Sequence, residues 1–179
     1  MLSLFVRRVD EALALPMVRT DSGRRAWVAV TALGSRPVVY AAVVVRCLRR
    51  TEAGPLWQPL AVLTAGDVAR EFVCRVIARP RPTAGALTYT QGPSFPSRHT
   101  TMALLAVRLV SDRRSHSRDS LAAAVGVSRM VLGAHWPTDV IGGWLFATCW
   151  LALTRTVLPI RRQNAGNCRP TTRKAWQRK

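Results

Sequence analysis

The stretch GAHWPTDVIGGWLFATCWLALTRTVL, Gly133 to Leu158, decides the fold. From Val140 onward it is apolar apart from three threonines and one arginine, and it is close to the ~20 residues with which a helix crosses a bilayer. Two polar residues, His135 and Asp139, stand directly before this apolar run. The stretch therefore predicts a membrane-spanning helix with a polar site at one end.

The composition also favours a membrane protein. The chain has 179 residues, a formal net charge of +18 and 49% hydrophobic residues. Soluble nucleic-acid-binding proteins share the positive charge but place it on a soluble face, whereas here the arginines cluster between apolar runs. We therefore expect no nucleic-acid partner. The four cysteines show no paired spacing, so neither a disulfide framework nor a zinc site is expected.

Five apolar segments are candidate membrane spans. They are Trp27–Val45, Leu56–Ala78, Thr100–Val110, Leu121–Ala134 and Val140–Leu158. Ionisable residues within such segments usually face the interior of a helix bundle, and Asp67 and Glu71 could pair there with Arg70, Arg75 or Arg108 in a structural role. We predict an all-α, polytopic membrane helix bundle of about five transmembrane helices plus an N-terminal amphipathic helix. A soluble helical protein with ordinary core helices is the alternative.

The two ends of the chain differ from its middle. We expect no cleavable signal peptide in residues 1–25, because they mix apolar residues with acids and arginines, as an amphipathic or interfacial helix does. Residues 26–160 form the predicted membrane domain, although the outer end of its first span is left open by the interruption at Gly34–Pro37. Residues 161–179 are polar and basic, which predicts a disordered cytoplasmic tail.

Arginine placement predicts the topology. Basic residues follow the first span, separate the third from the fourth, and follow the fifth. With five spans these three regions fall on one side, which the positive-inside rule makes cytoplasmic. The segments around His99 and His135 then lie together on the outer face.

The segment SRMVLGAHWPTD carries the first candidate site. If a helix extends through His135 and Asp139, which are four residues apart, the two side chains share a face, and Asp139 can orient the imidazole. Ser128 and Arg129 precede His135 by just under two turns and point toward the same region. The alternative is that His135 simply belongs to a turn between two helices.

Two further segments add positive charge to the same face. Pro80 and Pro82 favour an extended backbone, which turns Arg79 and Arg81 to one side, although ARPRP also fits a simple juxtamembrane basic sequence. The sequence PSRH places a hydroxyl, a guanidinium and an imidazole at a helix N-terminus, where free amides attract anions.

These histidines, arginines and open amides are suited to bind a phosphoryl group and to transfer it. Arginines and amides hold the oxygens, one histidine attacks phosphorus, and the other protonates the leaving alkoxide. The outer segments contain no carboxylate cluster with metal-ligand spacing, so we expect neither a metal nor another cofactor.

These residues resemble the type-2 phosphatidic acid phosphatase family, which shares its site with vanadium haloperoxidases. The resemblance spans about Leu33 to Leu158. The family's third motif, Ser-Arg, five residues, His, three residues, Asp, is complete from Ser128 to Asp139. Its second, Pro-Ser-Gly-His, has Arg98 in the glycine position, and its first, Lys, six residues, Arg-Pro, has Cys74 in the lysine position.

The resemblance implies a role for each matching residue. His135 would be the nucleophile that forms a phosphohistidine, Asp139 would orient it, and His99 would be the general acid. The phosphate would be bound by Arg81, Ser97 and Arg129. Cys74 cannot supply the cation of the lysine, and we hypothesise that Arg98 replaces that charge.

The resulting hypothesis is an integral-membrane lipid phosphate phosphatase in the plasma membrane, with its active site at the outer or periplasmic face. Substrate candidates are polyprenyl phosphates or diphosphates, phosphatidic acid and phosphatidylglycerol phosphate, and the expected partners are that substrate and membrane lipids. The alternative is a degenerate member that binds a lipid phosphate without turnover; a haloperoxidase fits poorly with the apolar spans. The sequence leaves the oligomeric state open.

Overall fold

The computed structural model describes residues 2–49, 55, 57–82, 86–88, 90–111 and 116–157, without the side chains of residues 2–4 and 116–118. Over these residues the chain forms helices and no strand, which confirms the predicted all-helical fold. The helices are α1 (Leu2–Ala12), α2 (Asp21–Ala32), α3 (Arg36–Leu48), α4 (Trp57–Ile77), α5 (Arg98–Val110), α6 (His116–Val131) and α7 (Pro137–Val157).

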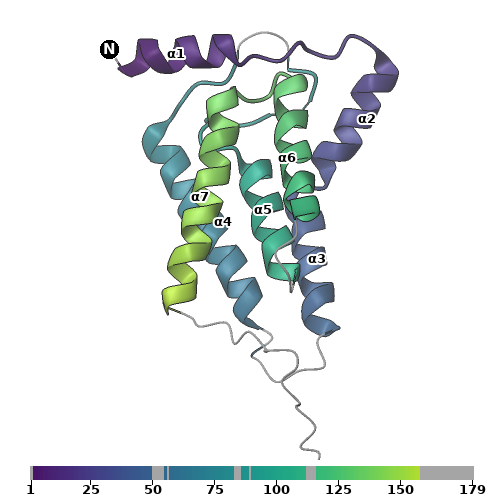
Figure 1. Ribbon diagram of the computed structural model, residues 1–179, viewed down its shortest axis with the longest axis vertical. Helices are drawn as coiled ribbons and strands as arrows, with labels where there is room; N and C mark the ends of the chain where they lie inside the picture. The colour runs from purple at the N-terminus through teal and green to yellow at the C-terminus, as the bar shows by residue number, and fades with distance from the viewer. Residues whose placement is uncertain are drawn as a thin grey trace, which may run out of the picture.

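The helices from α3 to α7 run side by side along the long axis of the molecule, and α1 lies across one end of them (Figure 1). The connections from α4 to α5 and from α6 to α7 are at that same end. The segments that carry the three candidate motifs therefore come together under α1. The predicted tail, residues 161–179, lies outside the described residues.

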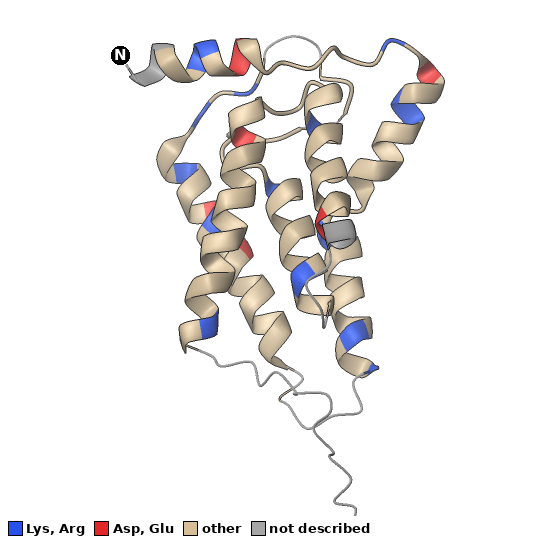
Figure 2. Ribbon diagram, viewed as in Figure 1, with Lys and Arg blue, Asp and Glu red and all other residues tan. Residues whose placement is uncertain are grey.

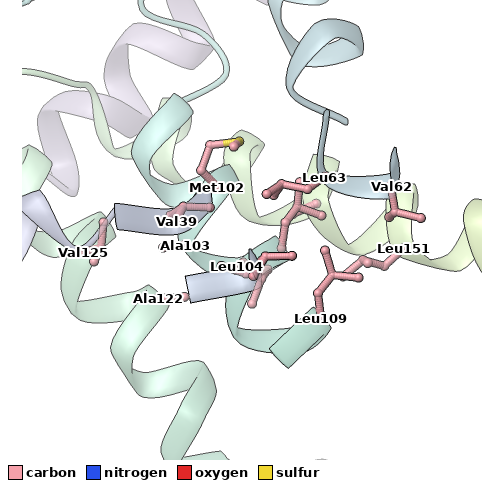
Figure 3. Packing of buried hydrophobic residues seen from close by; sticks show 14 of the residues in the cluster. Val39, Val62, Leu63, Met102, Ala103, Leu104, Leu109, Ala122, Val125 and Leu151 are labelled. Carbon is pink, nitrogen blue, oxygen red and sulfur yellow. The ribbon is translucent and has the colours of Figure 1, made fainter. Parts of the chain in front are cut away.

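Helix α5 forms the centre of the bundle, where it packs against α3, α4, α6 and α7. Residues 100–106, two threonines followed by five apolar residues, are all buried. A segment of helix that is buried on every side must have neighbours around its whole circumference. Figure 3 shows Met102 and Leu104 of α5 packed with Val39 of α3, Leu63 of α4 and Leu151 of α7.

Helix α4 has its polarity reversed relative to a helix of a soluble protein. Val68, Phe72 and Val76 recur every fourth residue and are 66%, 69% and 68% exposed, whereas Asp67 and Arg70 are buried. Apolar side chains on the outside and charges on the inside suit a lipid-facing helix, because lipid cannot solvate the charges.

Length and composition identify one helix that can cross a membrane alone, α7. Helices α2 and α3 pass the same test only as a pair, bent by 45°. The described helices thus provide one or two such spans by this measure, and the number of five stays a prediction. Helix α4 is as long as α7 but carries four charged residues, and α5 and α6 have 13 and 16 residues.

The four charged residues of α4, coloured along its ribbon in Figure 2, are paired, with Asp67 and Arg70 buried and Arg75 exposed. Asp67 accepts from Arg36 of α3 at 2.7 Å and lies 3.7 Å from Arg70, and Glu71 pairs with Arg70 and with Arg75. The structural role expected for Asp67 and Glu71 agrees with these pairs. Arg108, which we considered as a third partner, instead binds Asp119 of α6 at 3.0 Å.

The predicted first span is broken between α2 and α3, and the break positions the start of α5. A Cβ at Gly34 would lie 2.7 Å from the backbone oxygen of His99, so only glycine allows this approach. On the opposite side, a Cβ at Gly143 of α7 would lie 2.8 Å from the carbonyl oxygen of Ser97. Gly34 in the turn between α2 and α3 and Gly143 on α7 thus let two other segments pack closely against the PSRH segment.

Candidate functional site

His135 and Asp139 meet across the start of α7 and not along a continuous helix. The helix begins at Pro137, and His135 lies in the turn before it. The Asp139 carboxylate reaches back to accept a hydrogen bond from the Trp136 N–H at 2.9 Å. Such a backward bond satisfies an otherwise unpaired amide at a helix start. The turn considered as the alternative is therefore present, and it brings the two side chains together.

Asp139 is completely buried and lies beside the imidazole of His135. Its Oδ2 lies 3.5 Å from His135 Nδ1, a long contact that leaves Nδ1 without a closer partner. When Nδ1 carries the proton and faces this carboxylate, Nε2 keeps its lone pair. Burial lowers the pKa of His135 to about 4, against the raising effect of Asp139 and with a further lowering by Arg81 and Arg129. The imidazole is therefore neutral at pH 7.

Arg81 faces the free nitrogen of His135. Its Nη1 lies 3.1 Å from His135 Nε2 and donates to the carbonyl oxygen of Ala134 at 2.9 Å. Its other N–H groups donate to the carbonyl oxygens of residues 91, 92 and 93. Burial lowers the pKa of the Arg81 guanidinium below its ordinary value. The side chain has no carboxylate partner, so its charge is available to an anion beside Nε2.

Arg129 adds a second cation from α6. Its side chain is 2% exposed and donates from Nη1 to the hydroxyl of Thr31 at 3.0 Å, while its Nε has no partner. Its carbonyl oxygen accepts from the N–H groups of Ala134 and His135, which fixes the turn. The neighbouring Ser128 donates instead to a carbonyl of its own helix. A buried arginine with an unpaired donor is costly unless an anion completes it.

The PSRH segment, residues 96–99, forms the third side of the site, next to Arg81 and Arg129. Ser97 is the N-cap of α5 but makes no side-chain capping bond, so the first amides of α5 stay open. Its hydroxyl accepts from Thr100 at 3.1 Å, and its own N–H donates to the Asp139 carbonyl at 3.0 Å. Burial, together with the charges of Arg129, Arg98 and Arg81, lowers the pKa of His99 to about 3. The seven residues predicted for the site therefore lie together.

The lysine position of the first motif is occupied by a buried thiol. Cys74 is 4% exposed and donates to the carbonyl oxygen of Pro93 at 3.6 Å. Arg70, one turn earlier, is also buried, but its charge is matched by Asp67 and Glu71. Arg98 is half-buried and has no carboxylate partner among the described residues. Arg98 is therefore the better placed of the two cations to replace the lysine.

Sequence reasoning missed Asp10 and Thr138, which contact Arg79 at the site, and it placed Arg79 itself incorrectly. Arg79 was expected on the same side as Arg81, yet it turns away to Asp139, at 2.7 Å, and to Asp10 of α1. Asp10 also accepts from the N–H and the hydroxyl of Thr138. Only the alternation in ARPRP drew attention to Arg79, and nothing in the sequence indicated that Asp10 reaches α7.

Among the described residues, no three histidine, cysteine or acidic side chains lie together as metal ligands. The polar groups of the site are instead cations, imidazoles and open amides grouped around one carboxylate. This arrangement is suited to hold a tetrahedral anion beside His135 Nε2.

The sequence also matches known proteins. The family model of the PAP2 superfamily matches residues 55–163. The decaprenylphosphoryl-5-phosphoribose phosphatase of Mycolicibacterium smegmatis is 35% identical over 105 residues, which cover 51% of this chain and 58% of the relative. The match thus spans less than two thirds of that relative's length.

Two solved structures share the fold. A transmembrane PAP2-type phosphatidylglycerolphosphate phosphatase from Bacillus subtilis superposes with a TM-score of 0.70 over 90% of this chain and 89% of its own, at 19% identity. LpxE from Aquifex aeolicus superposes with a TM-score of 0.63 over 83% and 91%, at 21% identity. The fold expected from the resemblance is therefore confirmed, and because the family model covers more than half of the sequence, the chain belongs to the PAP2 superfamily.

Proposed function

We propose that the protein is a membrane phosphatase that hydrolyses a lipid phosphomonoester or diphosphate through a phosphohistidine at His135. The observation that carries the proposal is the environment of this imidazole. One nitrogen faces a buried carboxylate, and the other faces an arginine that has no carboxylate of its own. When a phosphate takes the Nη1–H of Arg81 that faces Nε2 in the structure, the phosphorus lies next to the lone pair that attacks it.

The two chemical steps balance with groups of this chain. In the first, the Nε2 lone pair of His135 forms a bond to phosphorus, and the P–O bond of the ester or anhydride breaks. Because burial and the nearby arginines lower the pKa of His99 to about 3, His99 takes up a proton only when the anionic phosphate binds, and it gives that proton to the departing oxygen. In the second, His99 takes a proton from water, the resulting hydroxide attacks phosphorus, and the N–P bond breaks. A phosphomonoester yields the dephosphorylated lipid and inorganic phosphate, a diphosphate yields the lipid monophosphate and inorganic phosphate, and no metal takes part in this scheme.

The phosphate oxygens are assigned to Arg81, Arg129, Arg98, Ser97 and the open amides of α5. Positive charge without carboxylate partners, placed beside a nucleophile, stabilises a phosphoryl transition state more than it stabilises a neutral ligand. Arg98 takes the place of the absent lysine at position 74. These assignments rest on the geometry and on the agreement with the family motifs.

The substrate is assigned by class only. The relatives named above act on a decaprenyl-linked phosphate and on phosphatidylglycerol phosphate according to their names, and both are phosphates on lipids. We infer a substrate whose chain stays in the bilayer while its headgroup reaches the end of the bundle under α1. With the arginine-rich loops in the cytoplasm, that end faces the outside of the plasma membrane.

Phosphate release in detergent, with EDTA present, tests the proposal. The panel contains a polyprenyl phosphate, a polyprenyl diphosphate, decaprenylphosphoryl-5-phosphoribose, phosphatidic acid and phosphatidylglycerol phosphate. We expect release from at least one of them, and its loss in His135→Ala. Inhibition by EDTA would contradict the metal-free mechanism. A protein that binds the lipids without releasing phosphate would instead be the degenerate member, which the departure at Cys74 favours and the complete third motif disfavours.

A further inference from the structure

Asp10 is unusual among the residues of the first helix. Its neighbours Arg8 and Glu11 are exposed, and Phe5 is 66% exposed, yet Asp10 is 1% exposed. A buried carboxylate is expensive unless cations and N–H donors surround it. Its partners therefore indicate what it does, and all of them belong to the active-site end of the bundle.

Both oxygens of Asp10 are used. Oδ1 accepts from the N–H of Thr138 at 2.9 Å and from its hydroxyl at 2.8 Å, and Oδ2 pairs with Nη2 of Arg79. The bond from Thr138 N–H satisfies one of the open amides at the start of α7. A residue of α1 thus caps the helix that carries Asp139.

Arg79 connects Asp10 to the nucleophile. Its Nη1 donates to Asp139 Oδ1 at 2.7 Å and to the Thr138 hydroxyl at 2.6 Å, while its Nη2 pairs with Asp10, so two buried carboxylates share one guanidinium. The Arg79 guanidinium also lies 5.8 Å from the ring centroid of Trp136. The remaining oxygen of Asp139 faces His135.

We propose that Asp10 is a positioning residue for the reaction at His135 and that α1 is therefore part of the active site. Asp10 binds Nη2 of Arg79 while Asp139 binds Nη1, so Asp10 fixes the position of the shared guanidinium. Without it, Arg79 pairs with Asp139 alone and turns that carboxylate away from the imidazole. This inference rests on the proposed function, because its main readout is turnover.

Asp10→Ala tests the inference, with Glu11→Ala as the matched control, because Glu11 is the next residue on the same helix and is exposed. We expect Asp10→Ala to lower kcat about 10-fold or more, as removal of an orienting group does, with KM changed less than ~2-fold. Glu11→Ala leaves both constants unchanged. An unchanged kcat in Asp10→Ala would overturn the inference.

A double-mutant cycle separates positioning from mere stabilisation. In an Arg79→Gln background, Asp10→Ala should change kcat less than ~2-fold, because Asp10 acts through Arg79. If Asp10→Ala lowers kcat equally in both backgrounds, or lowers only the melting temperature, Asp10 is structural.

Hydrogen exchange of the full-length protein in detergent gives a readout without turnover. We expect the amides of residues 136–139 to exchange at least ~10-fold faster in Asp10→Ala than in Glu11→Ala, because Thr138 loses its acceptor. Unchanged exchange there would contradict the Asp10 contact. A wild-type protein that releases no phosphate would contradict the proposed function, and the exchange result would still decide whether α1 orders the start of α7.

Discussion

The bundle holds two groups of arginines that differ in their carboxylate partners. On α3 and α4, Arg36, Arg70 and Arg75 are paired with Asp67 and Glu71, and a surface pocket of about 340 Å³ lies against this network. At the end under α1, a second group, Arg81, Arg98 and Arg129, has no carboxylate partner among the described residues.

This difference separates a structural charge network from a binding site. Paired charges in a bundle satisfy one another and hold two helices in register, and they gain little from a further ion. Cations left unpaired and partly buried repel one another, and an incoming dianion relieves that repulsion. We therefore propose that the second group, and not the first group beside its surface pocket, binds the phosphate.

Replacing one arginine from each group gives the largest expected difference. Arg81→Ala should lower kcat/KM about 10²–10³-fold, because a donor aimed at the developing charge is lost. Arg75→Ala, which removes an arginine that is paired and exposed, should change kcat/KM less than ~2-fold. Phosphate-release kinetics on the best substrate of the panel measure both. Similar losses in the two variants would remove the distinction between the groups.

Asp67→Asn tests the paired group from its acidic side. The change leaves the buried Arg70 with one carboxylate in place of two, and removal of one partner of a buried pair costs about 3 kcal/mol. We expect a lower free energy of unfolding, measured by denaturant titration in detergent, with kcat of the folded fraction unchanged. A strong drop in kcat at full folding would make this network part of the site.

Arg98→Gly restores the usual glycine and should have a smaller effect than loss of Arg81, about 10-fold on kcat, because Arg81 lies against His135 Nε2 and Arg98 adds charge from farther away. Adding Cys74→Lys to this variant should recover most of the activity, because it returns the charge to the position that the family uses. Unchanged kinetics in Arg98→Gly would contradict the compensation. If the double variant stays as slow as Arg98→Gly, the two cations are not equivalent.

The sequence predicted the main helices well where apolar runs are long. The run from Val140 predicts α7 within a few residues, and Leu56–Ala78 predicts α4 almost to the residue. The break between α2 and α3 was visible as an interruption, but its reason was not. Gly34 is required because the backbone of His99 passes close to it, and such a contact between distant segments leaves no local signal.

The site was predictable where residues are close in sequence and not where they meet in space. The spacing of His135 and Asp139 was informative, although the expected continuous helix is replaced by a turn capped by Asp139. Alternation drew attention to Arg79 and Arg81, but it predicted one shared side for them and did not indicate that Arg79 pairs with two carboxylates while Arg81 has none within the described part of the chain. Asp10 lay in a segment whose pattern predicts exposure, and only the packing of α1 on α7 reveals it.

The smallest expected effect is on pH dependence, and it tests the electrostatic side of the comparison. Burial and the unpaired cations lower the pKa of His135 to about 4, so the imidazole stays neutral until the pH falls through that value. An ordinary histidine with a pKa of about 6.5 is ~90% protonated at pH 5.5 and loses nucleophilicity ~10-fold there. We therefore expect His135 to lose almost none of its nucleophilicity between pH 7 and pH 5.5.

NMR titration of ¹⁵N-histidine-labelled protein in micelles measures the pKa of His135 directly, with His135→Ala to assign the signal. We expect a midpoint near pH 4 in the wild type and a higher one in Arg81→Ala, because removal of a cation favours the imidazolium. The Arg75→Ala midpoint should equal that of the wild type, since the charge removed is already paired. A wild-type midpoint near 6.5 would mean that negative charge neutralises the arginines around His135. The paired and unpaired groups of arginines would then differ only in their position in the bundle.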